Sequence, residues 1–209
     1  MKGEDEHYWI KIAQQIQAIA QSGLTYSEGK YDIDRYQQLK EISIQMVQHY
    51  TGEDYRKIVN LFTKEDGYKT PKVDVRGVVF KDNKILMVRE SVDGKWSLPG
   101  GWADVCLSPY ENAKKEIWEE AGLTVDPVRI LAIFDKMKHD HPPDIYHTYK
   151  LFVLCKGISG ELKTGIETTG VGYFAENDLP EMSLERNIPT QVKQMFRYRD
   201  DPSLPTYCE

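Results

Sequence analysis

The stretch from residue 98 to residue 125 constrains the fold of this chain more than any other part of it. It reads LPGGWADVCLSPYENAKKEIWEEAGLTV, which is a Gly-Gly turn, a short loop and then a helical segment over about 109–121. Apolar residues mark one side of the helix, and Gly122 is typical of a helix C-cap. We therefore expect the chemistry of the protein to lie in this segment.

Three glutamates lie close together on the expected helix. At about 3.6 residues per turn, Glu116 and Glu120 lie one turn apart on one face, and Glu119 lies beside them. Like charges at this spacing repel, and a divalent cation with oxygen ligands, Mg²⁺ or Mn²⁺, would compensate them. A solvated acidic helix face would carry the same residues, so the glutamates alone do not decide between the two interpretations.

The order of residues around these glutamates resembles the motif of the Nudix hydrolases, G-x5-E-x7-R-E-U-x-E-E-x-G-U, in which U is a bulky aliphatic residue. The matching positions are Gly101, Glu116, Ile117, Glu119, Glu120, Gly122 and Leu123. Two positions depart from the motif, because Leu107 replaces its first Glu and Lys115 replaces its Arg. Lysine keeps the charge but lacks the planar fork of arginine, so we expect looser orientation of the carboxylates.

The periodicity of apolar residues changes near residue 70. Up to residue 68 the periodicity is helical, with a first helix of about four turns interrupted at Gly23, a second that begins after Asp32 and a third over about 52–62. Beyond Pro71 the pattern predicts a hairpin, VDVRGVVF-KDN-KILMVRE, then strands near 128–136, 146–156 and 171–175 and a last helix over 188–198.

The resemblance extends over about residues 70–198 and implies an α+β fold. An N-terminal helical domain over 1–68 would precede a Nudix-type α/β/α sandwich with a mixed sheet over 69–209. The apolar helices predict a homodimer. No run approaches the roughly 18 apolar residues of a membrane span, and the first residues do not resemble an export signal, so we expect a cytoplasmic protein with no membrane partner.

The resemblance also implies metal-dependent hydrolysis of the pyrophosphate in a nucleoside diphosphate linked to another group, X. By similarity, Glu116, Glu119 and Glu120 would bind the metal together with the Gly100 carbonyl and the distal Glu167. The catalytic residues would be Glu116, Glu120 and Glu167, and the general base stays open between Glu120 and Glu167.

Several basic residues are candidates for binding the substrate. Arg76 and Arg89 lie on the expected hairpin, where a guanidinium could grip a phosphate. The loop KMKHDHPPDIYHTYK adds His139, His141 and Lys150. A structural or surface role remains the alternative for each of these residues.

The N-terminal helical domain followed by this motif resembles two-domain Nudix proteins of Gram-positive bacteria that act on ADP-ribose or CDP-choline. We expect CDP-choline, cleaved to CMP and phosphocholine, with ADP-ribose, cleaved to AMP and ribose 5-phosphate, as the alternative. A non-catalytic nucleotide sensor and an enzyme acting on RNA ends are further alternatives. The 27 Lys and Arg against 33 Asp and Glu give a net charge of −6, which disfavours RNA and argues against DNA as a partner.

Overall fold

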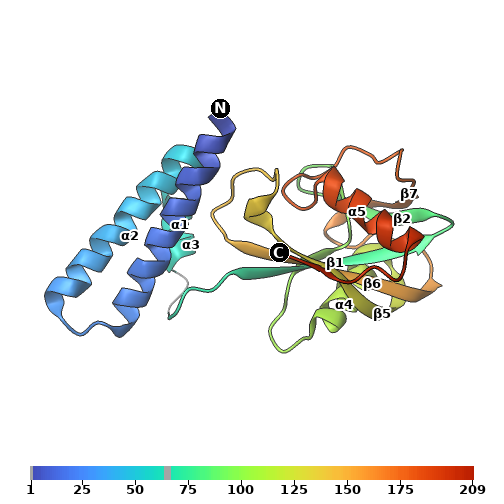
Figure 1. Cartoon of the computed structure of the whole chain (residues 1–209), viewed down its shortest axis with the longest axis horizontal. Coiled ribbons are helices and arrows are strands. Elements are labelled where there is room, and N and C mark those ends of the chain that lie inside the picture. The colour runs from blue at the N-terminus through green and yellow to red at the C-terminus, as the bar shows by residue number, and fades with distance from the viewer. Residues whose placement is uncertain (1, 64–66) are drawn as a thin grey trace. The chain divides into compact units, whose positions relative to one another are not determined.

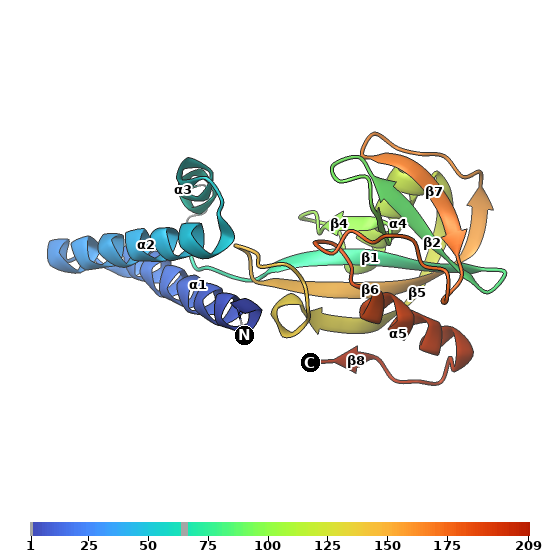
Figure 2. The same cartoon turned by 90° about the horizontal axis from the view of Figure 1, so that it is seen from above.

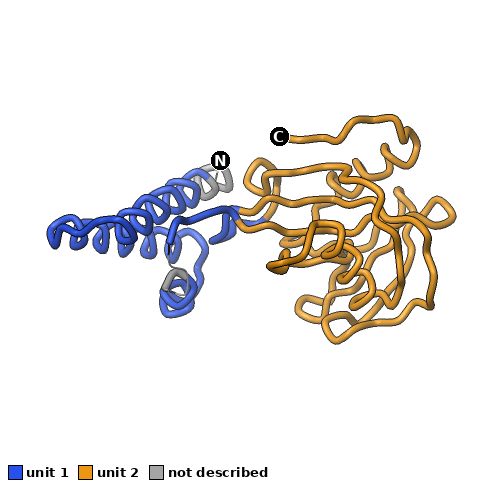
Figure 3. Tube along the Cα trace, turned by 90° about the horizontal axis from the view of Figure 1, so that it is seen from below, with its two compact units in different colours: residues 1–71, 142–147 blue, residues 72–141, 148–209 orange. Residues whose placement is uncertain are grey.

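The structure is a computed structural model that describes residues 2–63 and 67–209. The chain forms two compact units, one made of the residues up to Pro71 together with 142–147, and one made of 72–141 and 148–209 (Figure 3). The inclusion of residues 142–147 in the first unit was not predicted. Within the described ranges, no helix combines the length and the apolar character needed to cross a membrane.

The first unit is helical (Figure 1). It contains α1 (Lys2–Tyr26), α2 (Lys30–Thr51) and α3 (Tyr55–Thr63). One small apolar cluster holds the helices together: Ala13, Ile44, Val47 and Ile58 are buried, and Ile145 from the 142–147 segment packs against them. The predicted helical character is thus confirmed.

Two helix boundaries differ from the prediction. Helix α1 continues through Gly23, because this glycine serves close packing rather than termination: a Cβ there would collide with the ring of Tyr36 on α2. Helix α2 begins at Lys30 with Gly29 as its N-cap, so Asp32 lies inside the first turn, where it pairs with Arg35 at 2.7 Å. Whether Asp32 is the N-cap or lies in the first turn, its negative charge is favourable beside the positive end of the helix dipole.

The second unit is built on a sheet with helices on both faces. Its strands are β1 (Lys72–Lys81), β2 (Lys84–Glu90), β3 (Trp96–Ser97), β4 (Gly100–Trp102), β5 (Leu123–Asp135), β6 (Thr148–Gly160), β7 (Thr168–Phe174) and β8 (Tyr207–Cys208). Its helices are α4 (Pro109–Ala121), the short 3₁₀ turn η1 (Lys136–Lys138) and α5 (Pro189–Asp200). The predicted helices over 109–121 and 188–198 are therefore confirmed to within about two residues.

Strand β1 is the centre of the sheet and makes it mixed. It runs parallel to β6 and antiparallel to β2 and β4. The predicted hairpin is confirmed, and its turn residues Asp82 and Asn83 both have positive φ, at 50° and 61°, as a two-residue hairpin turn requires. The terminal strand β8 was not predicted and lies parallel to β5 at the sheet edge (Figure 2).

Each face of the sheet has its own apolar core. Helix α4 covers one face through Ala113, Ile117 and Ala121, which pack with Val75 and Val153. Helix α5 covers the other face, with Val192, Met195 and Phe196 buried there. Figures 1 and 2 show the two helices on opposite sides of the strands, which confirms the expected α/β/α arrangement.

Candidate metal and active site

The Gly100–Gly101 turn brings the chain back against the start of β1. Residues 100–102 pair with 74–76, and the Gly77 N–H donates to the Pro99 carbonyl at 2.8 Å. Gly100 has φ 144°, and a Cβ at this position would collide with the carbonyl oxygen of Val75. Only glycine fits so close to a neighbouring backbone, which gives a physical reason for the glycine at position 100, directly before the motif.

Helix α4 is capped at both ends. The Ser108 hydroxyl accepts from the Glu111 N–H at 3.3 Å, and the Glu111 carboxylate accepts from the Ser108 N–H at 2.8 Å, which together form a capping box. Gly122 ends the helix in the left-handed conformation, with φ 72°. The caps fix where the helix begins and ends, and so they fix which residues lie next to the glycine turn.

Two of the three glutamates of α4 that were predicted as metal ligands face that turn. Glu120 is buried, at 6% exposure, and its Oε2 accepts from the Gly100 N–H at 2.9 Å. The Glu116 side chain is 14% exposed, and a Cβ on Gly101 would lie only 3.4 Å from its Oε2. Glu119 lies further out, with a side chain 44% exposed. The structure thus brings Glu116 and Glu120 together beside Gly100 and Gly101.

The two inner carboxylates are costly to ionise where they lie. Burial raises the pKa of Glu120 to about 8, against the opposing influence of the Arg76 cation and the Gly100 N–H. Burial also raises the pKa of Glu116, and the nearby Glu119 adds to the effect while Lys115 opposes it. A raised carboxyl pKa means that negative charge at this place is incompletely compensated by the protein itself.

This arrangement fits a divalent cation with hard oxygen ligands. Within the described residues no three His, Cys, Asp or Glu side chains already converge as a closed metal cage. Mg²⁺ is commonly held by only one or two carboxylates, with water and substrate phosphates completing its shell, so Glu116 and Glu120 are a sufficient donor pair. The Gly100 N–H is engaged by Glu120; the metal role of the Gly100 carbonyl stays a prediction.

The loop that carries Glu167 is tied to the end of α4. The Thr168 hydroxyl donates to the Glu120 carbonyl at 3.0 Å and accepts from the Gly165 N–H at 2.8 Å. Glu167 itself is exposed, and its carbonyl accepts from the Ser91 N–H at 3.0 Å. The fold therefore holds this loop next to the acidic helix, although within residues 2–63 and 67–209 no hydrogen bond joins the Glu167 carboxylate to Glu116 or Glu120.

Arg76 and Lys150 are buried in an ion-pair network. Both Arg76 Nε, at 2.7 Å, and Lys150 Nζ, at 2.8 Å, contact the Asp74 carboxylate, and Arg76 also donates to the Leu98 carbonyl at 3.1 Å. Burial opposes the charge on Asp74, but the two cations outweigh it and hold the pKa of that carboxyl well below its usual range. Burial also lowers the pKa of Lys150 to about 8. The geometry gives both basic residues a structural contact, and substrate binding by them stays a prediction.

A second buried acid supports the segment that leads into the turn. Glu90 accepts from the Ser97 hydroxyl at 2.6 Å and pairs with Arg186 at 2.7 Å. Sequence reasoning missed both Asp74 and Glu90. The sequence carried a signal for Asp74, because Asp74 and Arg76 are two residues apart, lie between apolar residues of one strand and so share one face.

The remaining predicted substrate residues do not gather at one point. Arg89 is exposed and donates to the Gly94 carbonyl at 2.6 Å. His139 lies 2.9 Å from the Glu209 carboxylate, whereas His141 is buried against the Leu184 carbonyl at 2.6 Å. Burial lowers the pKa of His141 to about 4, so it is neutral at pH 7.

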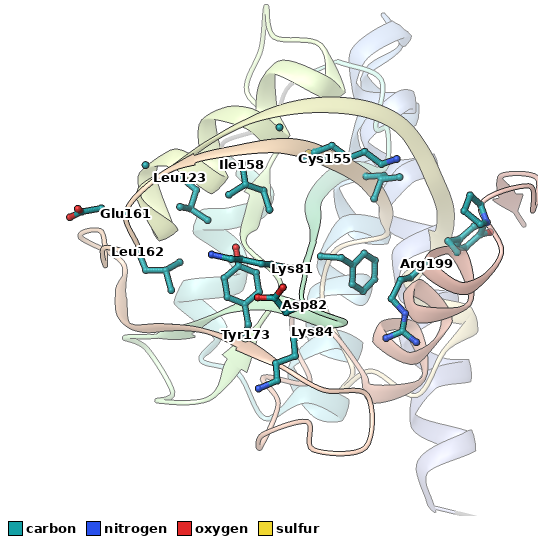
Figure 4. A pocket seen from close by; sticks show the side chains of 17 residues that line it. Lys81, Asp82, Lys84, Leu123, Cys155, Ile158, Glu161, Leu162, Tyr173 and Arg199 are labelled. Carbon is teal, nitrogen blue, oxygen red and sulfur yellow. The ribbon is translucent and has the colours of Figure 1, made fainter.

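A cavity of ≈ 1130 Å³ lies elsewhere in the second unit, around the tip of the β1–β2 hairpin and the end of β6. Figure 4 shows Leu123, Ile158 and Leu162 on one side of it and Arg199 on the other. Its lining does not include Glu116, Glu119 or Glu120. The acidic site and this cavity are therefore separate features of the domain.

Comparison with known protein families assigns the chain. Residues 70–196 match the NUDIX domain model, and residues 7–62 match a Nudix N-terminal domain described as UDP-X-like and as an oligomerisation domain. The chain belongs to the Nudix hydrolase family and is a pyrophosphatase of that class. Within the family it has the two-domain organisation of the UDP-X-like members.

Individual relatives show the same relationship. YjhB of Bacillus subtilis, named as a candidate ADP-ribose pyrophosphatase, is 46% identical over 198 residues, which cover 95% of each chain. The crystal structure of an ADP-ribose pyrophosphatase from Streptococcus suis is 40% identical with a TM-score of 0.61, and the match covers 67% of this chain and 100% of that one. The crystal structure of a UDP-X diphosphatase is 27% identical with a TM-score of 0.60 over 98% of this chain and 99% of that one.

Proposed function

We propose that this chain hydrolyses the pyrophosphate of ADP-ribose to AMP and ribose 5-phosphate. The observation that carries the proposal is the pair Glu116 and Glu120, held beside the Gly100 turn with their carboxyl pKa values raised by burial. Such a pair supplies ligands for a cation that can also bind a diphosphate. The names of the B. subtilis and S. suis relatives support ADP-ribose over other diphosphates.

The protein groups have separate tasks in this reaction. A Mg²⁺ or Mn²⁺ ion at Glu116 and Glu120 would neutralise the diphosphate and lower the pKa of a bound water. The Gly100 N–H donates to one oxygen of Glu120 at 2.9 Å, and the other oxygen would serve as the ligand of a cation. Glu119 would add negative charge beside the cation, and Glu167, on the loop that the Thr168 hydroxyl ties to α4, would accept a proton as general base.

A UDP-linked substrate is the second candidate. The N-terminal match to a UDP-X-like domain and the likeness to a UDP-X diphosphatase over nearly the whole chain support it. CDP-choline, which we expected from the sequence, does not occur in the names of the relatives described above. It stays in the test as a third diphosphate with a different X.

The test is product analysis with the purified full chain in Mg²⁺ or Mn²⁺. ADP-ribose, a UDP-sugar, CDP-choline and a capped RNA end are compared, with Glu120→Gln as the control. The proposal expects AMP and ribose 5-phosphate to form fastest and the variant to be inactive. Preferred cleavage of another diphosphate would replace the substrate, whereas tight nucleotide binding with no cleavage of any compound would favour the sensor alternative.

We also propose that the chain is a homodimer. The helical unit has a small core and leaves large side chains exposed, among them Ile19 at 60%, Tyr26 at 72% and Tyr31 at 69%. Apolar surface of this kind is typical of association surfaces. A light-scattering mass near twice the 24.2 kDa of one chain is expected, and a monomeric mass at micromolar concentration would refute the dimer.

A further inference from the structure

The loop between β4 and α4 is held against the helix by a buried asparagine. The Asn112 side chain accepts from the Asp104 N–H at 2.8 Å and donates to the carbonyls of Leu107, at 3.2 Å, and Ser108, at 3.0 Å. Asn112 is only 1% exposed, so these bonds are shielded from water. The backbone of Asp104 is therefore fixed relative to α4 even though its side chain reaches the surface.

From this position Asp104 contacts Lys115. The Lys115 ammonium lies 2.9 Å from Glu119, 3.2 Å from Asp104 and 3.5 Å from Glu116. An ammonium group has three N–H donors that can point in different directions, whereas the donors of a guanidinium lie in one plane. A lysine thus suits three carboxylates that surround one point, one from the loop and two from the helix.

The position at which the Nudix motif places its first Glu makes no such contact here. Leu107 is 37% exposed, and its carbonyl is held by Asn112. An acid is nevertheless present in the same loop, three residues earlier. The two departures from the motif, at 107 and 115, are thus accompanied by an acid at 104 that touches the replaced basic residue.

We propose that Asp104 is a positioning residue for the metal site, which anchors Lys115 and through it arranges Glu119 and Glu116. The loop carboxylate holds the ammonium on the outer side of the helix, so that its contact with Glu116 remains the longest of the three. Without Asp104 the ammonium would move onto Glu116 and Glu119 and compete with a divalent cation for their oxygens. The inference rests on the metal site proposed above.

The test measures Mn²⁺ affinity of the full chain by calorimetry, in the absence of substrate. Asp104→Asn keeps the size of the side chain and removes its charge, and we expect the affinity to fall roughly tenfold, the low end for groups that orient metal ligands. Asp104→Glu should retain most of the affinity. Leu107→Glu added to Asp104→Asn should restore part of it, because it returns an acid to the same loop.

Two controls separate positioning from a general charge effect. Asp126→Asn removes an exposed acid of β5 that lies 3.9 Å from Lys114, the residue before Lys115 on α4. This variant should leave Mn²⁺ affinity within about twofold of the parent. In a Lys115→Met background, Asp104→Asn should have no further effect, because the residue through which Asp104 acts is gone. Unchanged affinity in Asp104→Asn, or effects of the two changes that simply add, would overturn the inference. A parent chain that binds no Mn²⁺ would instead refute the proposed metal site.

Discussion

The helical unit and the sheet domain differ in the charge that they bury: among the described residues, the sheet domain holds buried ion pairs beside exposed ones. In the helical unit the ion pairs Arg35–Asp32 and Lys57–Glu53 lie at the surface, and the side chains of the first pair are 71% and 57% exposed. In the sheet domain, Arg76 and Asp74 form a pair whose side chains are 4% and 9% exposed. Burial of charge is expensive, and the domain that bears it is the one with an apolar core on both faces of its sheet.

This difference explains why the candidate site lies in the sheet domain. A small core, such as that formed by Ala13, Ile44, Val47 and Ile58, leaves little free energy to offset unpaired charge. The two larger clusters of the sheet domain can support a carboxyl with a raised pKa, such as that of Glu120. The acidic site is accordingly found in the sheet domain.

The largest effect is expected at Glu120. Glu120→Gln keeps an oxygen that can accept from the Gly100 N–H but removes the charge, so hydrolysis should fall by about 10³-fold or more while the fold persists. The measurement is turnover at saturating Mg²⁺ together with a melting curve of the metal-free protein. Near-parental turnover with an unchanged melting curve would remove Glu120 from the metal site.

The buried and exposed ion pairs should respond very differently to loss of one partner. Arg76→Met leaves Asp74 buried with only Lys150, and it should cost about 3 kcal/mol of unfolding free energy. Arg35→Met, the matched change at the exposed pair, should cost less than about 0.5 kcal/mol. Both are measured by urea unfolding, and equal costs would break the contrast between the two units.

The apolar core of the helical unit can be tested separately. Ile58→Ala removes a fully buried side chain from the cluster and should destabilise this unit by about 2 kcal/mol. Hydrogen exchange should then speed up in α1, α2 and α3 and stay unchanged in β1 and β6. Faster exchange throughout the sheet domain would show that the two units do not respond independently.

The pH dependence of stability sharpens the comparison further. The pKa of Glu120 in the folded protein, about 8, lies above the ordinary value of 4.5. The contribution of Glu120 to the free energy of unfolding is therefore fully present below pH 4.5 and is lost as the pH rises through 8. Between pH 6.5 and 8 the metal-free protein should lose up to about 2 kcal/mol. Burial lowers the pKa of His141 to about 4, so its titration affects stability mainly below this pH window. Burial lowers the pKa of Lys150 to about 8, so its titration affects stability mainly above the window.

Chemical unfolding at several pH values checks this expectation. The Glu120→Gln variant should lack most of the slope, and saturating Mg²⁺ should flatten it in the parent, because the cation favours the ionised carboxylate. A parent protein whose stability rises from pH 6.5 to 8 without metal would contradict the assignment of Glu120 as a carboxyl that is costly to ionise.

Local patterns predicted much of this architecture from the sequence. The hairpin over 72–90 and the helix over 109–121 follow from alternation, turn residues and caps, which act over a few residues. The end of the first helix was predicted wrongly because glycine often ends helices, whereas here Gly23 lies inside the helix and makes room for the Tyr36 ring. That role depends on a neighbouring helix, which no local pattern reveals.

The site was predictable to a similar degree. The spacing of Glu116 and Glu120 on one helix placed them on one face, as the structure also does, whereas Glu119 lies further out. The partners from other elements, such as Asp74 against Lys150, depend on the register of β1 and β6 and were not foreseen. Asp104 was missed for a different reason, because its contact with Lys115 depends on a loop conformation held by Asn112.

The most direct measurement is carboxyl ¹³C NMR of Glu120 in the full chain, with the Glu120→Gln variant to assign its signal. The structure predicts a carboxyl that titrates near pH 8 without metal, and whose titration moves well below that value when Mg²⁺ is added. A Glu120 carboxyl that titrates near its ordinary value of 4.5 and does not respond to Mg²⁺ would contradict the claim that burial prepares this site for a cation.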